Sequence, residues 1–230
     1  MSYSIESITE IIGARRVGDT PATIDWLLTD SRSLSFPEET LFFALTTKRN
    51  DGARYIPDLY ARGVRNFVVS EQTAKLVDSG KLIVDSSMQR DSAQPTINYQ
   101  LSTINLLIVP SPLKALQKLA EQHRDRFQIP VIGITGSNGK TIVKEWLHQL
   151  LSPERIIARS PRSYNSQIGV PLSVWQMNEE SELALLEAGI SEPGEMRALQ
   201  NIIKPTIGIL TNIGGAHQEN FFSLQEKCME

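Results

Sequence analysis

The pattern of apolar and polar positions divides the chain into two stretches, and the first alternates between helical and strand-like spacing. Residues 1–12 space their isoleucines as one face of a short helix that Gly13 ends, and residues 53–61 predict a second helix. Four short apolar runs have the length and the β-branched or aromatic content of strands: 24–28, 41–45, 67–69 and 106–109. This alternation predicts a small α/β domain over residues 1–109.

The pattern weakens between Glu71 and Asn105, where polar residues dominate and apolar residues keep no sustained period. A segment of this length without a period is typical of a surface insertion. We therefore predict an insertion over residues 71–105, with one strand at 82–84.

The second stretch, residues 110–230, alternates more regularly. Pro110-Ser111-Pro112 interrupts the pattern and predicts a helix with Ser111 as its N-cap. Apolar runs predict four buried strands: 129–134, 156–158, 183–186 and 206–210. Helical spacing follows at 142–151, 168–175 and 195–204. Such strand–helix repeats build a parallel sheet with right-handed crossovers. A capping box at Ser223 and Glu226 opens a helix that runs into Glu230, so this domain is expected to be truncated.

A glycine turn joins the first of these strands to its helix and carries candidate chemistry. It reads Thr135-Gly136-Ser137-Asn138-Gly139-Lys140-Thr141. Backbone N–H groups and a helix N-terminus at such a turn attract phosphate oxygens, the lysine reaches the β- and γ-phosphates, and the threonine hydroxyl can bind Mg²⁺. Ile134 stands where the general phosphate-loop pattern has glycine. The alternative is a glycine turn that only connects the two elements, but Lys-Thr in the first helical turn favours a P-loop ATPase-type domain that binds ATP.

Bulk composition excludes several other classes of protein. The 230 residues carry a net charge of −3, which provides no global attraction for nucleic acid or anionic membranes. No apolar run approaches the roughly 20 residues of a spanning helix. The single cysteine, Cys228, excludes an internal disulfide and fits a reducing compartment, so a cytoplasmic location is expected.

Polar residues at the ends of two other predicted strands could meet this loop. Glu187 follows the strand at 183–186, and His217 ends the segment that begins with Asn212. Ligands of parallel sheets bind beyond the carboxyl ends of the strands, and a carboxylate and an imidazole are plausible metal ligands there. Taken singly, Glu187 could be a solvated strand end and His217 an ordinary loop histidine. His123 and His148 are interpreted as structural.

Other polar segments give weaker signals. Asn165 lies in a loop that reads only as a capped helix entry. Ser31 and Arg32, and the turn with Lys48 and Arg49, offer donors for an anionic ligand, although solvated basic turns explain them as well. Arg15 and Arg16 are interpreted as surface charge.

Five motifs in order resemble the Mur ligase family of ATP-dependent amide ligases that build the peptidoglycan stem peptide. They are Thr29-Asp30-Ser31-Arg32 with the 41–45 strand, the 135–141 loop, Asn165-x-x-Ile168-Gly169-Val170-Pro171-Leu172, Leu186–Gly189 and Asn212–His217. The third and fifth motifs are most similar to members that join D-alanyl-D-alanine to UDP-N-acetylmuramoyl tripeptide. The resemblance implies an acyl phosphate made from ATP on the tripeptide carboxylate, which the dipeptide amine then attacks.

The resemblance also implies roles for residues. Lys140 would hold the β- and γ-phosphates, Thr141 and Glu187 would bind one Mg²⁺, and His217 a second. The rest of the ATP-binding set would be Thr135, Gly136, Ser137, Asn138, Gly139 and Asn165. Ser31 and Arg32 would meet the uridine diphosphate, and the turn at Lys48 and Arg49 the sugar–peptide.

A family lysine and a C-terminal domain are expected beyond Glu230, so the chain is predicted to be a fragment that is inactive alone. Some bacteria fuse a following alanine racemase domain, which the sequence leaves open. Three alternatives remain: an earlier-step ligase that adds L-lysine or diaminopimelate, a nucleotide- or UDP-sugar-binding module without ligase activity, and a generic P-loop ATPase. The last is disfavoured because no strand-borne aspartate of its second motif is evident.

Overall fold

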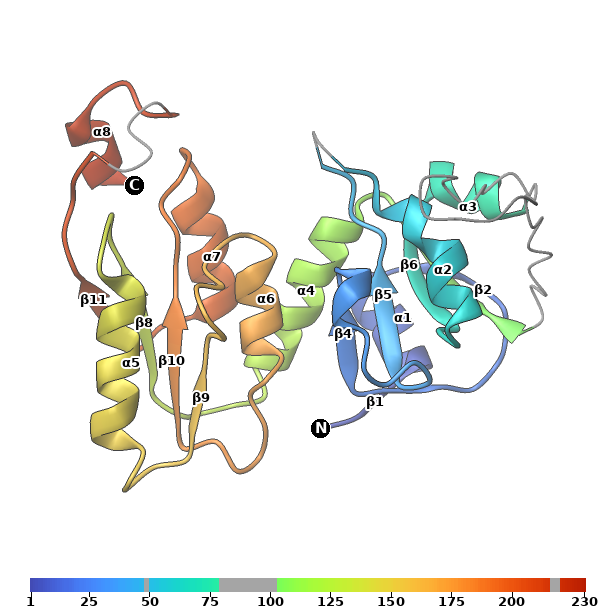
Figure 1. The fold of residues 1–230 in the computed structure, drawn as a ribbon, viewed down its shortest axis with the longest axis horizontal. Helices are drawn as coiled ribbons and strands as arrows, with labels where there is room; N and C mark the ends of the chain where they lie inside the picture. Colours follow the sequence, from blue (N-terminus) through green and yellow to red (C-terminus); the bar gives the residue numbers. More distant parts are fainter. Residues whose placement is uncertain (48–49, 79–102, 216–219) are drawn as a thin grey trace. The chain divides into compact units, whose positions relative to one another are not determined.

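A computed structural model describes residues 1–47, 50–78, 103–215 and 220–230 (Figure 1). The chain divides into two compact units, residues 1–116 and 117–230. The division falls within helix α4 (Pro112–Arg124) rather than in the loop before it. Within the described residues, no helix is long and apolar enough to cross a membrane.

The first unit is built on a five-stranded sheet. Its strand order is β2 (Arg15–Val17), β7 (Asn105–Val109), β6 (Asn66–Ser70), β5 (Thr40–Phe43) and β4 (Trp26–Leu28). Neighbouring strands are parallel except β2, which pairs antiparallel with β7. A separate antiparallel pair joins β1 (Tyr3–Ser4) to β3 (Thr23–Ile24). The α/β class predicted for this stretch is confirmed.

The first helix of this unit begins and ends at residues with clear capping roles. Helix α1 (Ile5–Ile12) starts at Ser4, whose hydroxyl accepts a hydrogen bond from the Ser7 amide, and ends at Gly13 in the left-handed region. Short 3₁₀ turns η1 (Ser31–Ser33) and η2 (Gly52–Tyr55) precede and follow β5, and η2 leads into α2 (Ile56–Ala61).

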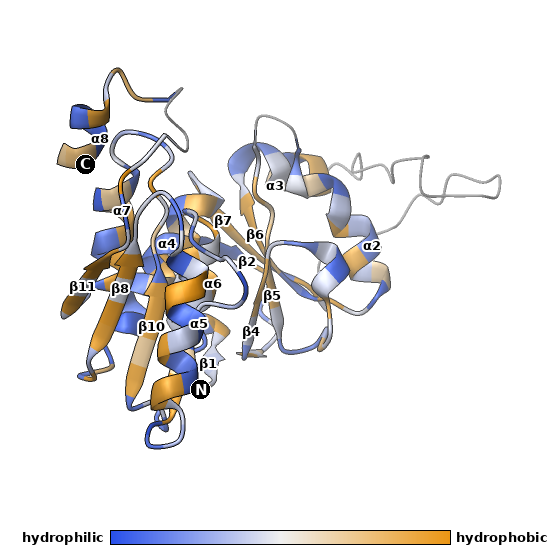
Figure 2. Ribbon diagram, turned by 60° about the vertical axis from the view of Figure 1, so that its left-hand side comes forward, coloured by the Kyte–Doolittle hydropathy of each residue, from blue (hydrophilic) through white to orange (hydrophobic). Residues whose placement is uncertain are grey.

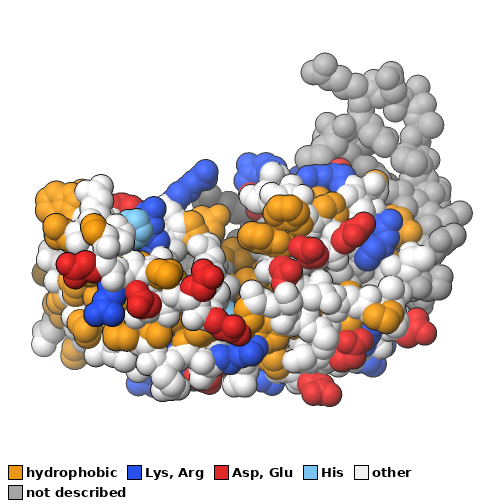
Figure 3. Space-filling model, turned by 90° about the horizontal axis from the view of Figure 1, so that it is seen from below, with side chains coloured by type: hydrophobic (Ala, Val, Ile, Leu, Met, Phe, Trp, Pro, Cys, Tyr) orange, Lys and Arg blue, Asp and Glu red, His pale blue; other side chains and the backbone are white. Residues whose placement is uncertain are grey.

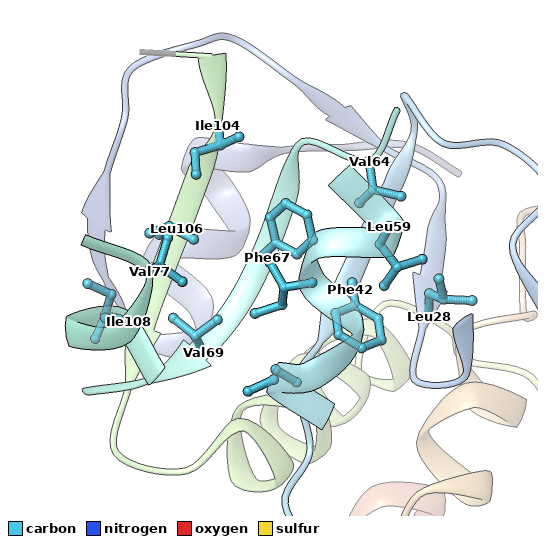
Figure 4. Packing of buried hydrophobic residues seen from close by; sticks show 14 residues of the cluster. Leu28, Phe42, Leu59, Val64, Phe67, Val69, Val77, Ile104, Leu106 and Ile108 are labelled. Atoms are coloured by element: carbon cyan, nitrogen blue, oxygen red, sulfur yellow. The ribbon is translucent and has the colours of Figure 1, made fainter. Parts of the chain in front are cut away.

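The core of this unit forms where α2 and α3 (Glu71–Asp78) cover one face of the sheet (Figure 4). Phe42 and Phe67 lie at its centre, with ring centroids 6.4 Å apart in an edge-on arrangement. Ala74 and Val77 of α3 are buried in the same cluster. The expectation that an irregular surface insertion begins at Glu71 is therefore wrong for α3, and residues 79–102, including the predicted strand at 82–84, lie outside the described residues.

Strand β2 and Arg16 depart from the expectations as well. Two arginines in three residues gave no strand signal, yet β2 completes one edge of the sheet. The interpretation of Arg16 as surface charge is wrong, because its guanidinium donates to Asn105 Oδ1 at 2.8 and 3.0 Å and to the Thr20 carbonyl at 2.8 Å. Arg15, by contrast, is exposed and pairs with Glu71.

The second unit contains a fully parallel four-stranded sheet, as predicted. Its strand order is β11 (Ile207–Leu210), β8 (Val131–Thr135), β10 (Leu183–Glu187) and β9 (Ile157–Arg159). Its helices are α5 (Lys140–Leu151), α6 (Gly169–Val174), α7 (Glu195–Ile203) and α8 (Leu224–Met229), in addition to the end of α4. Figure 2 shows these strands as largely apolar, between helices with more mixed surfaces.

Alternating residues of β8 and β10 serve two separate cores. Val131, Ala184 and Leu186 face α6 and α7, where Val170, Val174, Leu199 and Ile202 are buried. Ile132, Ile134, Leu183 and Leu185 face the opposite side, where Val143, Leu147 and Leu151 of α5 cover the sheet. Alternate side chains of a strand point to opposite faces, so this sheet is covered on both sides, as parallel sheets usually are.

The apolar residues of α5 do not all face the sheet. Ile142, Trp146 and Leu150 form a second stripe with exposed fractions of 57%, 64% and 74%. The sequence period alone does not separate the two stripes, because the six apolar residues form one continuous arc over about half of the helix circumference.

Candidate nucleotide-binding site

The turn between β8 and α5 has the backbone shape of a phosphate loop. Gly136 has a φ of +129° and Gly139 a φ of +84°, and residues with a side chain rarely adopt these backbone conformations. A Cβ on Gly136 would also lie 2.2 Å from Thr211 Oγ1 and 2.7 Å from the Asn212 carbonyl oxygen. Glycine at position 136 is therefore required both by conformation and by the close approach of the segment after β11.

That neighbouring segment holds the loop in place. The Ser137 amide donates to the Asn212 carbonyl at 2.9 Å, and the Asn138 amide donates to Asn212 Oδ1 at 3.0 Å. Thr211 Oγ1 donates to the carbonyls of Thr135 and Asn138 at 3.1 and 2.6 Å. The backbone amides of residues 137 and 138 therefore already donate hydrogen bonds within the protein.

The groups at this turn that could bind an anion lie at the start of α5. The first-turn amides of a helix have no intrahelical acceptor, and the helix dipole favours negative charge there. Lys140 opens the helix, and its Nζ donates to the Gly136 carbonyl at 2.6 Å, so the ammonium folds back over the loop. Burial lowers the pKa of Lys140, Glu187 opposes that shift, and Lys227 adds to it.

Thr141 and Glu187 come together at the same edge of the sheet, although 46 positions separate them. Thr141 Oγ1 donates to Glu187 Oε2 at 3.1 Å. Glu187 is the last residue of β10 and is fully buried. The placement arises because β8 and β10 are parallel neighbours, so their carboxyl ends meet.

This pair of residues fits a magnesium ion. Carboxylate and hydroxyl oxygens are the hard ligands that Mg²⁺ prefers. Glu187 Oε1 is buried and accepts no hydrogen bond of acceptable geometry from the described residues, although the Lys144 ammonium lies 2.9 Å away. His217, the predicted second ligand, lies outside the described residues, and the described part of the chain contains no cluster of three or more His, Cys, Asp or Glu side chains suited to a metal.

Two buried lysines lie near the loop and are not predicted from the sequence. Lys144 of α5 is fully buried and contacts Glu187, while Lys227 of α8 is 1% exposed. Lys227 Nζ donates to Ser137 Oγ at 3.1 Å and to the Gly214 carbonyl at 3.0 Å. A helical position with a charged residue reads as solvent-facing, and only the three-dimensional packing shows that these two are not.

Asn165 lies beside the end of β10. Its carbonyl accepts the Gly189 amide at 2.7 Å, and a Cβ on Gly189 would lie 2.8 Å from that oxygen. The structure therefore brings Asn165, which the resemblance includes in the ATP-binding set, to the same sheet edge as Glu187.

In the first unit, the predicted substrate residues are arranged differently. Ser31 is buried, and its carbonyl accepts a hydrogen bond from Arg62 at 2.8 Å. The Arg32 side chain is 87% exposed and pairs with Asp30 at 2.7 Å, which lowers the pKa of the Asp30 carboxyl. Asp30 also accepts the Arg32 amide as the cap of η1. Lys48 and Arg49 lie outside the described residues.

His123 has a structural setting, as interpreted from the sequence. Its Nε2 lies 2.9 Å from the Met177 carbonyl, and its ring packs against Trp175 and Phe127. Burial lowers its pKa to about 4, so the ring stays neutral near pH 7.

The surface charge in Figure 3 is mixed, with acidic and basic side chains interspersed on the face drawn.

Comparison with known proteins agrees with this geometry. Residues 134–229 match the Mur ligase middle domain. The chain is 32% identical over 200 residues to a protein of Bacillus subtilis, covering 87% of this chain and 38% of that protein. It is 33% identical over 194 residues to a protein of Borreliella burgdorferi, covering 84% of this chain and 38% of that protein.

Solved structures show the same fold. MurF from Acinetobacter baumannii matches with a TM-score of 0.79 at 24% identity, covering all of this chain and 45% of that one. MurF ligase from Thermotoga maritima in complex with ADP matches with a TM-score of 0.66 at 27% identity, covering 88% of this chain and 41% of that one.

A parallel sheet with this loop, a threonine–glutamate pair at its edge and these matches indicate one class of protein: residues 134–229 match a Mur ligase middle domain, and most of the chain is similar to Mur ligases. Within the family, the Bacillus and Borreliella relatives are both named UDP-N-acetylmuramoyl-tripeptide–D-alanyl-D-alanine ligase. The chain spans under half the length of these relatives, 38% in both cases.

Proposed function

We propose that this chain supplies the UDP-substrate domain, residues 1–109, and part of the ATP-binding domain, from residue 110, of an amide ligase. The reaction joins D-alanyl-D-alanine to UDP-N-acetylmuramoyl tripeptide with consumption of ATP. The observation that carries the proposal is the phosphate loop with Thr141 and Glu187 at its edge, in a chain similar to relatives that bear this activity in their names. The adenine nucleotide is supported by the ADP bound to the Thermotoga relative.

In this reaction the γ-phosphoryl group of ATP passes to the terminal carboxylate of the tripeptide, which leaves ADP and an acyl phosphate. The dipeptide amine then attacks the acyl carbon, and the tetrahedral intermediate releases phosphate and loses a proton to give the amide. Both phosphoryl partners are anions, so alignment and charge neutralisation carry most of the catalysis.

The residues at the sheet edge have distinct parts in this proposal. Lys140 holds the β- and γ-phosphates at the start of α5, where its ammonium already lies over the loop. Thr141 and Glu187 hold Mg²⁺, which when bound neutralises phosphate charge. His217, the second expected ligand, and Asn165 keep their predicted roles in this proposal.

The first unit would bind the UDP-sugar–peptide. Ser31 and Arg32 lie in η1 after β4. The exposed guanidinium of Arg32 pairs with the Asp30 carboxylate and can pair with a diphosphate instead. Lys48 and Arg49 are assigned to the sugar–peptide. A cytoplasmic location, predicted from the single cysteine, belongs to the same proposal, and the fused racemase domain stays a prediction.

The test is phosphate release by the complete gene product with MgATP and UDP-N-acetylmuramoyl tripeptide, with and without D-alanyl-D-alanine. We expect release only when the dipeptide is present. Release that depends instead on L-lysine or diaminopimelate would indicate the earlier-step ligase, and tight nucleotide binding without release under any condition would indicate a binding module.

Lys140→Met is the matched variant for this assay. Because it removes a charge that faces the transferred phosphoryl group, we expect turnover to fall by about 10²- to 10³-fold. Lys118→Met makes the same substitution at an exposed position of α4 and should leave turnover unchanged.

A further inference from the structure

Lys144 is a fully buried lysine on a helix face that otherwise packs apolar residues against the sheet. It lies on α5 beside Val143 and Leu147, which cover β8 and β10. Burying an ammonium costs several kcal/mol unless oxygen atoms compensate it. An apolar residue would serve packing alone, so the charge needs a further explanation.

The ammonium of Lys144 joins three separate segments. It donates to the Ser160 carbonyl at 2.7 Å and to the Arg162 carbonyl, both in the turn after β9. It also lies 2.9 Å from Glu187 Oε1 at the end of β10. Glu145 Oε1, at 3.2 Å, is its second carboxylate neighbour and belongs to a half-exposed side chain.

The turn that receives these hydrogen bonds needs an anchor. Arg162 has a φ of +49°, in the left-handed region that residues other than glycine rarely adopt. The turn leads to Asn165, whose carbonyl accepts the Gly189 amide beside Glu187. Ser160 contacts Glu187 through the backbone as well, because its hydroxyl accepts the Glu187 amide at 3.0 Å.

Lys144 and Thr141 contact different oxygens of the Glu187 carboxylate. Lys144 faces Oε1 and the Thr141 hydroxyl binds Oε2. A carboxylate is planar, so fixing the direction of one oxygen fixes the other. Both residues belong to the helix that follows the phosphate loop, so they hold Glu187 in a constant position relative to Lys140.

We propose that Lys144 is a positioning residue that orients the Glu187 carboxylate toward Thr141 for binding of the nucleotide-linked magnesium ion, and that ties the Ser160–Arg162 turn to the phosphate-loop helix. The inference rests on the nucleotide site of the proposed function. Lys144 would therefore affect only the increase in nucleotide affinity that Mg²⁺ provides. Lys140 would instead affect binding of the phosphates themselves.

The test is calorimetric titration of residues 1–230 with ADP, once with excess Mg²⁺ and once with EDTA. In the unchanged chain, Mg²⁺ should tighten ADP binding. In Lys144→Met this gain should shrink by about 10- to 100-fold, as is usual when an outer partner of a metal ligand is removed, while the affinity measured in EDTA stays close to that of the unchanged chain. Lys118→Met is the control at an exposed position and should keep the full gain.

A double-mutant cycle with Glu187→Gln separates this role from general damage to the fold. Glu187→Gln should remove the magnesium gain, and Lys144→Met should add no further loss in that background, because both act through one carboxylate. If Lys144→Met does not fold, Lys144→Gln, which keeps two N–H donors for the carbonyls, replaces it.

Three results would overturn the inference. Additive losses in the cycle, or a magnesium gain in Lys144→Met equal to that of the unchanged chain, would show that Lys144 does not act through Glu187. Absence of any ADP binding by the unchanged chain would instead overturn the proposed nucleotide site itself, and the inference with it.

Discussion

The two units of this chain both bury polar side chains within a mostly parallel sheet, but they bury different kinds. In the first unit, Asn66 and Asn105 are each 1% exposed and share a hydrogen bond of 2.8 Å between neighbouring strands. In the second, Lys144 and Glu187 are both fully buried and oppositely charged. The amides complete the fold around β2, whereas the charges lie at the sheet edge beside the phosphate loop.

The comparison indicates what buried charge can reveal about a site. A neutral amide network satisfies buried backbone and side-chain groups at modest cost. A buried ion pair gains little stability over apolar residues of similar volume, so its presence at the candidate nucleotide-binding edge favours a role in function. The predictions below test this difference between the units.

The largest effect on stability is expected from breaking the ion pair. Lys144→Met leaves the buried Glu187 carboxylate without its charged partner, and we expect the free energy of unfolding to fall by about 3–5 kcal/mol. Urea unfolding of the chain gives this value. Lys144→Met combined with Glu187→Gln should recover part of the loss, and a double variant less stable than the single one would contradict the account.

His123 offers a test through pH, because it is the titratable group of the second unit that burial keeps neutral. Its pKa falls from 6.5 to about 4 in the folded chain. Between these values the unfolded chain binds a proton that the folded chain does not, so the free energy of unfolding falls as pH falls through the window. The loss from pH 7 to pH 4 should reach about 3 kcal/mol.

The control for this pH effect is His123→Gln, which can still donate to the Met177 carbonyl but does not titrate. Other carboxyl groups titrate in both proteins, so the difference between their stability curves isolates the histidine. Parallel curves for the two proteins from pH 7 to pH 4 would show that His123 is not kept neutral.

A smaller effect is expected from the amide network of the first unit. Asn105→Leu removes the acceptor of two Arg16 hydrogen bonds and the donor to Asn66. The groups left without partners should lower the free energy of unfolding by about 1–3 kcal/mol. ADP binding by the second unit should be unchanged. A weaker ADP affinity in this variant would remove the distinction between the two networks.

The smallest effect on stability is expected at Arg32. A substitution there should weaken substrate binding without changing the free energy of unfolding. Its side chain is exposed and pairs with Asp30 at the surface, so Arg32→Ala should unfold at the same urea concentration as the unchanged chain. Binding of UDP-N-acetylmuramoyl tripeptide, followed by calorimetry, should weaken. Unchanged binding would remove Arg32 from the proposed substrate site.

The parts of this structure that the sequence predicts are those with strong local signals. Apolar runs mark β5 to β8 and β10, and the loop between β8 and α5 follows from its glycines and Lys140. Glu187 could be placed at the sheet edge because strand ends of a parallel sheet meet there. Family resemblance added roles that spacing alone did not provide.

The remaining features depend on contacts that no local pattern contains. Strand β2 carries two arginines in three residues, and Arg16 is structural only because Asn105 lies on the adjacent strand. Lys144 looks like a solvent-facing residue of an amphipathic helix, and its burial follows from the turn after β9. Asn212 holds the phosphate loop from a position far along the chain.

The central claim is that the second unit binds the nucleotide at its charged sheet edge. The most direct test is hydrogen exchange of residues 1–230 with and without MgADP, measured separately for each peptide of the chain. If the charged edge of the second unit is the nucleotide site, MgADP should slow exchange in peptides that contain Gly139–Ile142 and Glu187, and leave β4 to β7 of the first unit unchanged. ADP bound by the chain without protection of the phosphate-loop peptides, or with protection confined to the first unit, would contradict the account.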